Sequence, residues 1–179
     1  MIAKIDTLNK KFGKRFRLFV ILILAVFMVY WLLFVRNTHH DEYHVHAGFK
    51  VFLDDKPVDF SASKYMYFQP CGLPSSQQKA LKDKVHLHDR IGDVVHVHAE
   101  GVKWDDLFTS LKYEIPKNKN LSFYVDGIKT GDLLNTIIKD NQSVIIVIDG
   151  KKEDKEYLKD KVSSEKIEKV AKTKENCGE

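Results

Sequence analysis

Six of the eight histidines in this chain form three His-x-His pairs between residues 44 and 98. The pairs are His44/His46, His86/His88 and His96/His98. Side chains two residues apart on a β-strand point to the same face, about 7 Å from each other along the strand. Neighbours on adjacent strands come within about 4.5–5.5 Å at Cβ. Imidazoles so arranged can converge on one cation at about 2.0–2.1 Å, so we predict a metal site that draws on all six.

The expected ion is copper or zinc, because three or four imidazole ligands suit these two metals about equally. Met66 and Cys71 could add soft sulfur ligands for cuprous copper. Nearby carboxylates could bind the metal or accept the second ring N–H of a ligating histidine. The carboxylates near the pairs are Asp41, Glu42, Asp89, Asp93 and Glu100.

Alternation of apolar and polar residues predicts the strands that carry the pairs. Residues 45–53 place apolar side chains at odd positions and mostly polar ones at even positions, with Phe52 as the exception. We expect a two-residue turn at Asp55-Lys56 to follow. Residues 85–99 alternate in the same way, and a three-residue loop over 90–92, with Gly92 in the left-handed conformation, would pair His86 with His96. All four histidines of that hairpin would then share one face.

The remaining pattern predicts an α+β fold, with a small, mainly antiparallel sheet and two or three helices. Residues 61–83 show no period and suggest a loop with one helical turn near 77–82. Helices are expected over 102–111 and 131–140, and strands over 121–125, with an Asp126-Gly127 turn, and 144–148. Residues 151–179 are highly charged, which predicts a solvated helix or a tail.

An uncharged apolar run covers residues 18–35 and follows a basic segment over residues 1–17. As a helix it would extend roughly 27 Å, which predicts a transmembrane helix. Bulky residues after the run argue against a cleaved signal peptide and for a signal-anchor. The basic flank predicts a cytoplasmic N-terminus and a single-pass cell-membrane protein with an extracytoplasmic C-terminal domain. The expected divisions are the flank (1–17), the transmembrane helix (18–35), a linker (36–42), the histidine-rich domain (43–150) and the charged C-terminal segment (151–179).

Composition and motifs exclude several classes of protein. The net charge is +4, but residues 1–17 hold six Lys or Arg against one Asp, so the rest of the chain is slightly acidic and no nucleic-acid partner is expected. Two cysteines, Cys71 and Cys177, could form one disulfide but not a multi-disulfide scaffold. No P-loop, dinucleotide fingerprint, nucleophile elbow or His-Glu-x-x-His helix is present.

Two stretches, HVHAGFKVFLDDKPVDF and VHLHDRIGDVVHVHAEGV, resemble uncharacterised single-pass, exported prokaryotic proteins with repeated His-x-His strands. The resemblance covers about residues 43–112 and implies no activity. Locally, the triplets are similar to the zinc strands of alpha-type carbonic anhydrases and to the copper strand of copper-zinc superoxide dismutases. Residues 121–149 resemble a β-grasp, ubiquitin-like arrangement.

These observations leave three functional hypotheses. The first is a membrane-anchored, extracytoplasmic module that holds copper or zinc for sequestration, delivery or sensing. The second is a zinc- or copper-dependent enzyme with three histidine ligands and Glu100 or Asp89 as base. The third is a structural or interaction protein with a solvated histidine face, whose charged C-terminal helix would bind a partner. A histidine face that responds to pH is a further alternative. An enzyme should keep an open coordination position inside a pocket, which the loop over 61–83 would cover. The protein partner is unknown.

Overall fold

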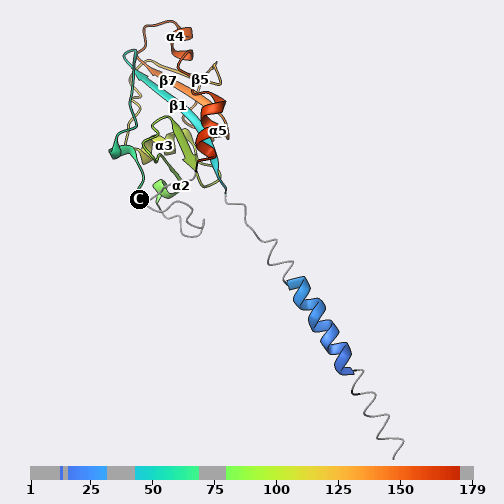
Figure 1. Ribbon diagram of the computed structural model, residues 1–179. Coiled ribbons are helices and arrows are strands. Elements are labelled where there is room, and N and C mark those ends of the chain that lie inside the picture. Colours follow the sequence, from blue (N-terminus) through green and yellow to red (C-terminus); the bar gives the residue numbers. More distant parts are fainter. Residues whose placement is uncertain (1–12, 14–15, 32–42, 69–79, 174–179) are drawn as a thin grey trace, which may run out of the picture. The chain divides into compact units, whose positions relative to one another are not determined.

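The computed structural model describes residues 13, 16–31, 43–68 and 80–173 of the chain. The chain forms two compact units, Met1–Asp41 and Glu42–Glu179, shown in Figure 1. In the first unit, residues 16–31 are helical. The second unit contains all the strands described below, and the predicted linker over 36–42 lies outside the described residues.

The structure corrects the prediction of a membrane anchor. The described part of the first helix covers residues 16–31, and positions 32–35 of the predicted span lie outside the described residues. A helix needs about 20 apolar residues to cross a hydrocarbon core of about 30 Å. Among the described residues, no helix combines the length and the apolar character that crossing a membrane requires. The transmembrane helix over 18–35, the single-pass anchor and the cell-membrane and extracytoplasmic location inferred from it are therefore wrong.

A seven-stranded sheet forms the second unit, in the order β3-β4-β1-β7-β5-β6, with β2 paired to β1. The strands are β1 (Val45–Leu53), β2 (Lys56–Pro57), β3 (Val85–His86), β4 (Val94–Val97), β5 (Leu121–Val125), β6 (Ile128–Thr130) and β7 (Ser143–Ile148). The β1–β7 pair is parallel, whereas β1–β2, β1–β4, β3–β4, β5–β6 and β5–β7 are antiparallel. The predicted α+β class is confirmed.

Within this sheet, β1 lies between β4 and β7, and β5 lies between β7 and β6. β1 and β7, the first and last strands along the described chain, are parallel neighbours inside the sheet. All six residues of β7 are buried, which fits its nearly unbroken apolar sequence and its central position.

The first face of the sheet packs against α3 (Trp104–Ser110). Odd-numbered residues of β1 point to this face, and Phe49 lies 6.3 Å from Trp104 and 6.1 Å from Phe108 between ring centroids.

Two short helices, η1 (Ser63–Tyr65) and α2 (Leu81–Lys84), interrupt the loop that was expected over 61–83. Residues 131–140 form turns instead of the expected helix. They bury Leu133 and Ile138 in this core, but these side chains do not form a continuous helical face.

The second face of the sheet is covered by the C-terminal helices α4 (Asp154–Leu158) and α5 (Ser164–Ala171), and Figure 1 shows α5 beside β1. Tyr157 packs on Phe52, with ring centroids 5.2 Å apart. Val162, Ile167 and Val170 form a buried cluster with Val94. The expected solvated helix or tail is thus replaced by two helices with one buried side each, since a few spaced apolar residues supply it.

Three tight turns contain consecutive residues with positive φ: Asp54–Asp55, Asp89–Arg90 and Asp126–Gly127. The third was predicted, the first lies one residue earlier than expected, and the second replaces a left-handed Gly92. Gly92 is needed for another reason, because a Cβ there would lie 2.4 Å from the backbone nitrogen of Ser61. The predicted pairing of His86 with His96 is confirmed.

Candidate metal centre

The six histidines of the three pairs lie on one face of three adjacent strands. His46 of β1 is paired with His96 of β4, and His96 is paired with His86 of β3. Directly opposed residues share a face, so these three rings form a row across the sheet with His96 in the middle. Side chains two residues apart share a face as well, which adds His44, His98 and His88 to the same surface.

Their rings form one continuous cluster. The His88 and His96 ring centroids are 3.7 Å apart, and His46 lies 4.4 Å from His96. Other neighbouring pairs are His44–His46 at 4.4 Å, His44–His98 at 4.5 Å and His86–His98 at 5.0 Å. Each of the six rings therefore lies close to another ring of the cluster, as the spacing of the pairs predicts.

Three members, His44, His46 and His96, could hold a metal ion together. Each offers one ring nitrogen, and these three atoms lie within 4.8 Å of one another. Three nitrogens bound tetrahedrally at about 2.0–2.1 Å would be about 3.3 Å apart. Small rotations of the side chains would therefore bring the three nitrogens to ligand distance. We call His44, His46 and His96 the three-histidine group.

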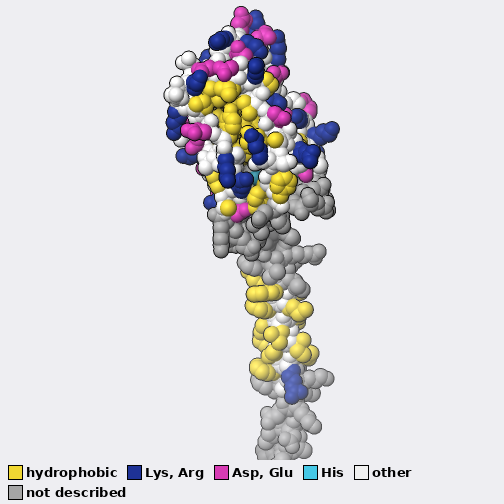
Figure 2. Space-filling model, turned by 90° about the vertical axis from the view of Figure 1, so that its left-hand side faces the viewer, with side chains coloured by type: hydrophobic (Ala, Val, Ile, Leu, Met, Phe, Trp, Pro, Cys, Tyr) yellow, Lys and Arg dark blue, Asp and Glu magenta, His cyan; other side chains and the backbone are white. Residues whose placement is uncertain are grey.

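Burial distinguishes this cluster from an ordinary polar sheet face. His96 has 0% of its surface exposed and His86 has 2%. His46, His88 and His98 are also buried, while His44 is exposed. On the surface shown in Figure 2, lysine, arginine and acidic side chains intermingle over the domain and hardly any histidine is visible. A solvated histidine face is thus contradicted, and an ion bound to the group would be largely shielded from water.

Two further histidines have their ring orientation fixed by hydrogen bonds. His86 Nδ1 donates to the Lys82 carbonyl oxygen at 2.7 Å, and His88 Nδ1 donates to Asp89 Oδ2 at 2.8 Å. Because carbonyl and carboxylate oxygens only accept, the proton resides on Nδ1, and Nε2 carries the lone pair in the neutral ring. Histidines that bind metals typically donate their other ring N–H in this way.

The backbone of β1 is fixed beside the three-histidine group by a loop that the sequence did not indicate. The His46 N–H donates to Asp140 Oδ1 at 3.0 Å, and the Asn141 N–H donates to the His46 carbonyl at 2.8 Å. Asn141 has a φ of 56°, a conformation that asparagine tolerates better than most residues. Asp140 and Asn141 therefore position a candidate ligand.

Tyr67 supports the other side of the cluster. Its ring stacks on that of His86, with centroids 4.6 Å apart, and its hydroxyl donates to Asp83 Oδ1. Burial and the Asp83 carboxylate raise the pKa of Tyr67 to about 12. Tyr67 lies in the aperiodic loop, where no sequence signal connected it to the histidines.

The other residues predicted as metal ligands, or as acceptors for a ring N–H, mostly lie away from the histidine cluster or outside the described residues. Met66 is buried in the core on the first face of the sheet, so it packs there rather than among the histidines. Asp93 pairs with Lys50 and Lys166, and Glu100 is exposed. Of the carboxylates proposed to accept a ring N–H, Asp89 does so. Asp41, Glu42, Cys71 and Cys177 lie outside the described residues.

Comparison of the chain with protein-family models, with curated proteins and with solved structures gave no match. The resemblance to exported His-x-His proteins therefore remains an expectation. The triplet similarities to two classes of metalloenzyme bring no residue roles to this chain. The function has to be inferred from the arrangement of the histidines themselves.

Proposed function

We propose that this chain binds a copper or zinc ion through His44, His46 and His96. The observation that carries the proposal is the approach of three ring nitrogens to within 4.8 Å of one another. All three ligands are imidazoles, which favour copper and zinc over magnesium or calcium. The bound ion would also stabilise the β1–β4 pair, since His46 and His96 belong to different strands.

The burial of the group suggests a module that holds and transfers its ion. His44 is exposed while His46 and His96 are buried, so an ion would reach the site by way of His44. His98, whose ring lies 4.5 Å from that of His44, and His88, whose ring lies 3.7 Å from that of His96, are the candidates for a fourth ligand. Four imidazoles would complete a tetrahedral shell without water. Sequestration or delivery of the ion is therefore the role that we infer.

A metalloenzyme is the second candidate, because three histidines leave one coordination position open. Such an enzyme would also need a base beside the bound water. Of the two bases considered from the sequence, Asp89 accepts the His88 N–H through Oδ2, and Glu100 is exposed. These positions favour the binding module, in which a carboxylate orients a ring rather than accepting a proton from water.

The test is titration calorimetry of the full chain, without a histidine tag, against zinc and against copper at pH 7.5. We expect binding of one ion of at least one of these metals per chain. His44→Ala should weaken binding at least tenfold without unfolding the domain, because the His44 side chain is exposed. His96→Ala should remove most binding.

The matched comparison is His86→Gln, which changes a histidine of the same cluster outside the three-histidine group. A smaller loss in that variant than in His44→Ala would support the assignment. X-ray absorption at the metal edge should count three or four nitrogen ligands at about 2.0 Å. Failure of the folded chain to bind either metal at pH 7.5, or unchanged affinity in His44→Ala, would overturn the proposal.

A further inference from the structure

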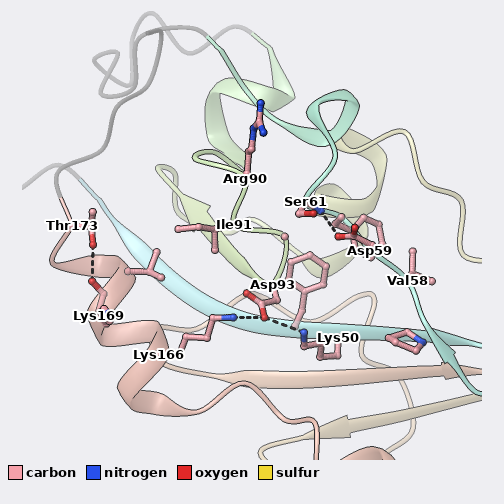
Figure 3. Close-up of a pocket in the computed structure, with 15 residues that line it drawn as sticks. Lys50, Val58, Asp59, Ser61, Arg90, Ile91, Asp93, Lys166, Lys169 and Thr173 are labelled. Atoms are coloured by element: carbon pink, nitrogen blue, oxygen red, sulfur yellow. Dashed lines mark hydrogen bonds and ion pairs between the residues drawn. The ribbon is translucent and has the colours of Figure 1, made fainter.

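A second candidate site lies along one side of α5, next to β1. It is a cavity of about 760 Å³ bounded by α5, by residues 57–61 and by the turn over 90–93 (Figure 3). Its lining contains no histidine, so it is distinct from the three-histidine group. Volumes of about 300–1,000 Å³ are usual for cavities that hold small molecules.

Apolar side chains form much of the cavity wall. Phe49 and Phe60, whose ring centroids are 5.4 Å apart, belong to the core of the first face. Ile91 and Val170 belong to the cluster that holds α5 against the sheet. The apolar part of the lining consists of Phe49, Pro57, Val58, Phe60, Ile91 and Val170. Phe49, Phe60 and Val170 are buried, whereas Pro57, Val58 and Ile91 keep accessible surface. The latter three could therefore contact the apolar body of a ligand.

The charged groups of the lining have a positive excess. Lys50, Arg90, Lys166 and Lys169 stand against two carboxylates, Asp59 and Asp93, which leaves a net charge of +2. Two of the ammonium groups meet the same oxygen, because Asp93 Oδ2 lies 3.0 Å from Lys50 Nζ and 2.5 Å from Lys166 Nζ. Figure 3 shows the two lysines reaching this carboxylate from opposite sides.

The two carboxylates remain ionised at neutral pH. Burial opposes ionisation of Asp93, but hydrogen bonds from Lys166 and Lys50 lower its pKa below the ordinary value. Hydrogen bonds from Ser61 lower the pKa of Asp59 as well. One carboxylate cannot neutralise two ammonium groups, and each ammonium has three N–H donors. Donors and one positive charge thus remain available at the Lys50–Asp93–Lys166 triad.

We propose that this cavity binds a small organic carboxylate with an apolar body, such as a medium-chain fatty acid. The carboxylate accepts hydrogen bonds from Lys50 and Lys166, and the chain packs against the apolar wall. Charge-assisted bonds of this kind are stronger than bonds between neutral groups. The proposal does not depend on metal binding, because the two sites share no residue.

The test is calorimetric titration of the full chain with decanoate. Decanol serves as the neutral ligand of equal chain length. We expect decanoate to bind and decanol to bind at least tenfold more weakly. Lys166→Met keeps the apolar stem and removes the charge, so it should weaken decanoate binding at least tenfold. The matched control is Lys172→Met, which removes a lysine of the same helical segment that is 78% exposed and outside the cavity.

Thermal unfolding identifies any variant that fails to fold. Lys169→Met provides a second test, because Lys169 lines the cavity and forms no ion pair with another residue in the described part of the chain. A several-fold loss of decanoate affinity in that variant supports the proposal. Equal binding of decanol and decanoate would overturn it, as would unchanged affinity in a folded Lys166→Met protein. Absence of decanoate binding at millimolar concentration overturns it too.

Discussion

Gly48 allows the C-terminal segment to pack against the sheet, and replacing it by alanine should weaken that contact. A Cβ at position 48 would lie 2.5 Å from Val162 Cβ, 2.8 Å from Val162 Cγ1 and 3.2 Å from Ile167 Cδ1. The nearest of these atoms is attached directly to the backbone, so rotation of a flexible side chain cannot remove the overlap. The segment before α5 has to move instead.

Two opposing effects determine how much Gly48→Ala changes the free energy of unfolding. Alanine in a strand loses less conformational entropy than glycine, a gain of roughly 0.5–1 kcal/mol. Overpacking a buried contact costs about 1–3 kcal/mol. The overlap should dominate, because Val162 and Ile167 are both buried and have little room to relax. We expect Gly48→Ala to lower the free energy of unfolding by about 1–2 kcal/mol.

Urea unfolding, followed by the fluorescence of the fully buried Trp104, measures this change. The matched control is Gly131→Ala, since a Cβ at position 131 meets nothing within 4 Å. That variant should be unchanged or up to about 1 kcal/mol more stable. Zinc or copper binding should survive in Gly48→Ala, because the three-histidine group lies outside the contact. A Gly48→Ala protein as stable as the wild type would refute the packing of residues 162–167 on β1.

Two further predictions concern the histidine cluster. Metal affinity should fall steeply below about pH 6, with uptake of more than one proton, because ligating imidazoles must be neutral and the ordinary histidine pKa is about 6.5. Calorimetry at pH 7.5 and at pH 5.5 measures this fall. An affinity that is the same at both pH values would contradict histidine ligation. Tyr67→Phe removes the hydroxyl bond to Asp83 but keeps the ring on His86, so it should cost about 0.5–1.5 kcal/mol in urea unfolding at pH 7 and alter metal affinity little. The pKa of Tyr67 is raised from 10.0 to about 12 in the folded protein. The contribution of Tyr67 to the free energy of unfolding is therefore complete below pH 10 and is lost as the pH rises towards 12. If the difference in unfolding free energy between wild type and Tyr67→Phe stays constant across this range, the prediction is wrong.

The sequence predicted the histidine cluster well because period-2 alternation and i, i+2 spacing are local properties. They placed His86 opposite His96 in one hairpin, as the structure confirms. They could not supply the β1–β4 pairing, which joins residues about 50 apart and brings His46 beside His96. The choice of the three-histidine group therefore depends on strand order, which single-sequence patterns do not contain.

The sequence did not predict that α4 and α5 cover the second face of the sheet, for a different reason. Residues 151–173 are so highly charged that their few apolar positions gave no clear helical face. The complementary signal was Gly48, a residue that weakens strands and marks a close approach of another segment. Gly48 stands at an even position of the alternation, among mostly polar residues. A glycine in that place indicated contact with Val162.

The even-numbered residues of β1 show how one strand face can serve several purposes. His44 and His46 contribute to the candidate metal group, Gly48 meets the segment before α5, Lys50 pairs with Asp93 at the cavity, and Phe52 packs on Tyr157. The alternation correctly separated these positions from the apolar core, but polarity did not mean exposure. A buried polar residue costs free energy unless its hydrogen-bonding groups are satisfied, and sequence features that oppose local packing rules tend to mark functional positions. On that argument the buried histidines of this face, rather than its apolar core, are where the function of the chain should be sought.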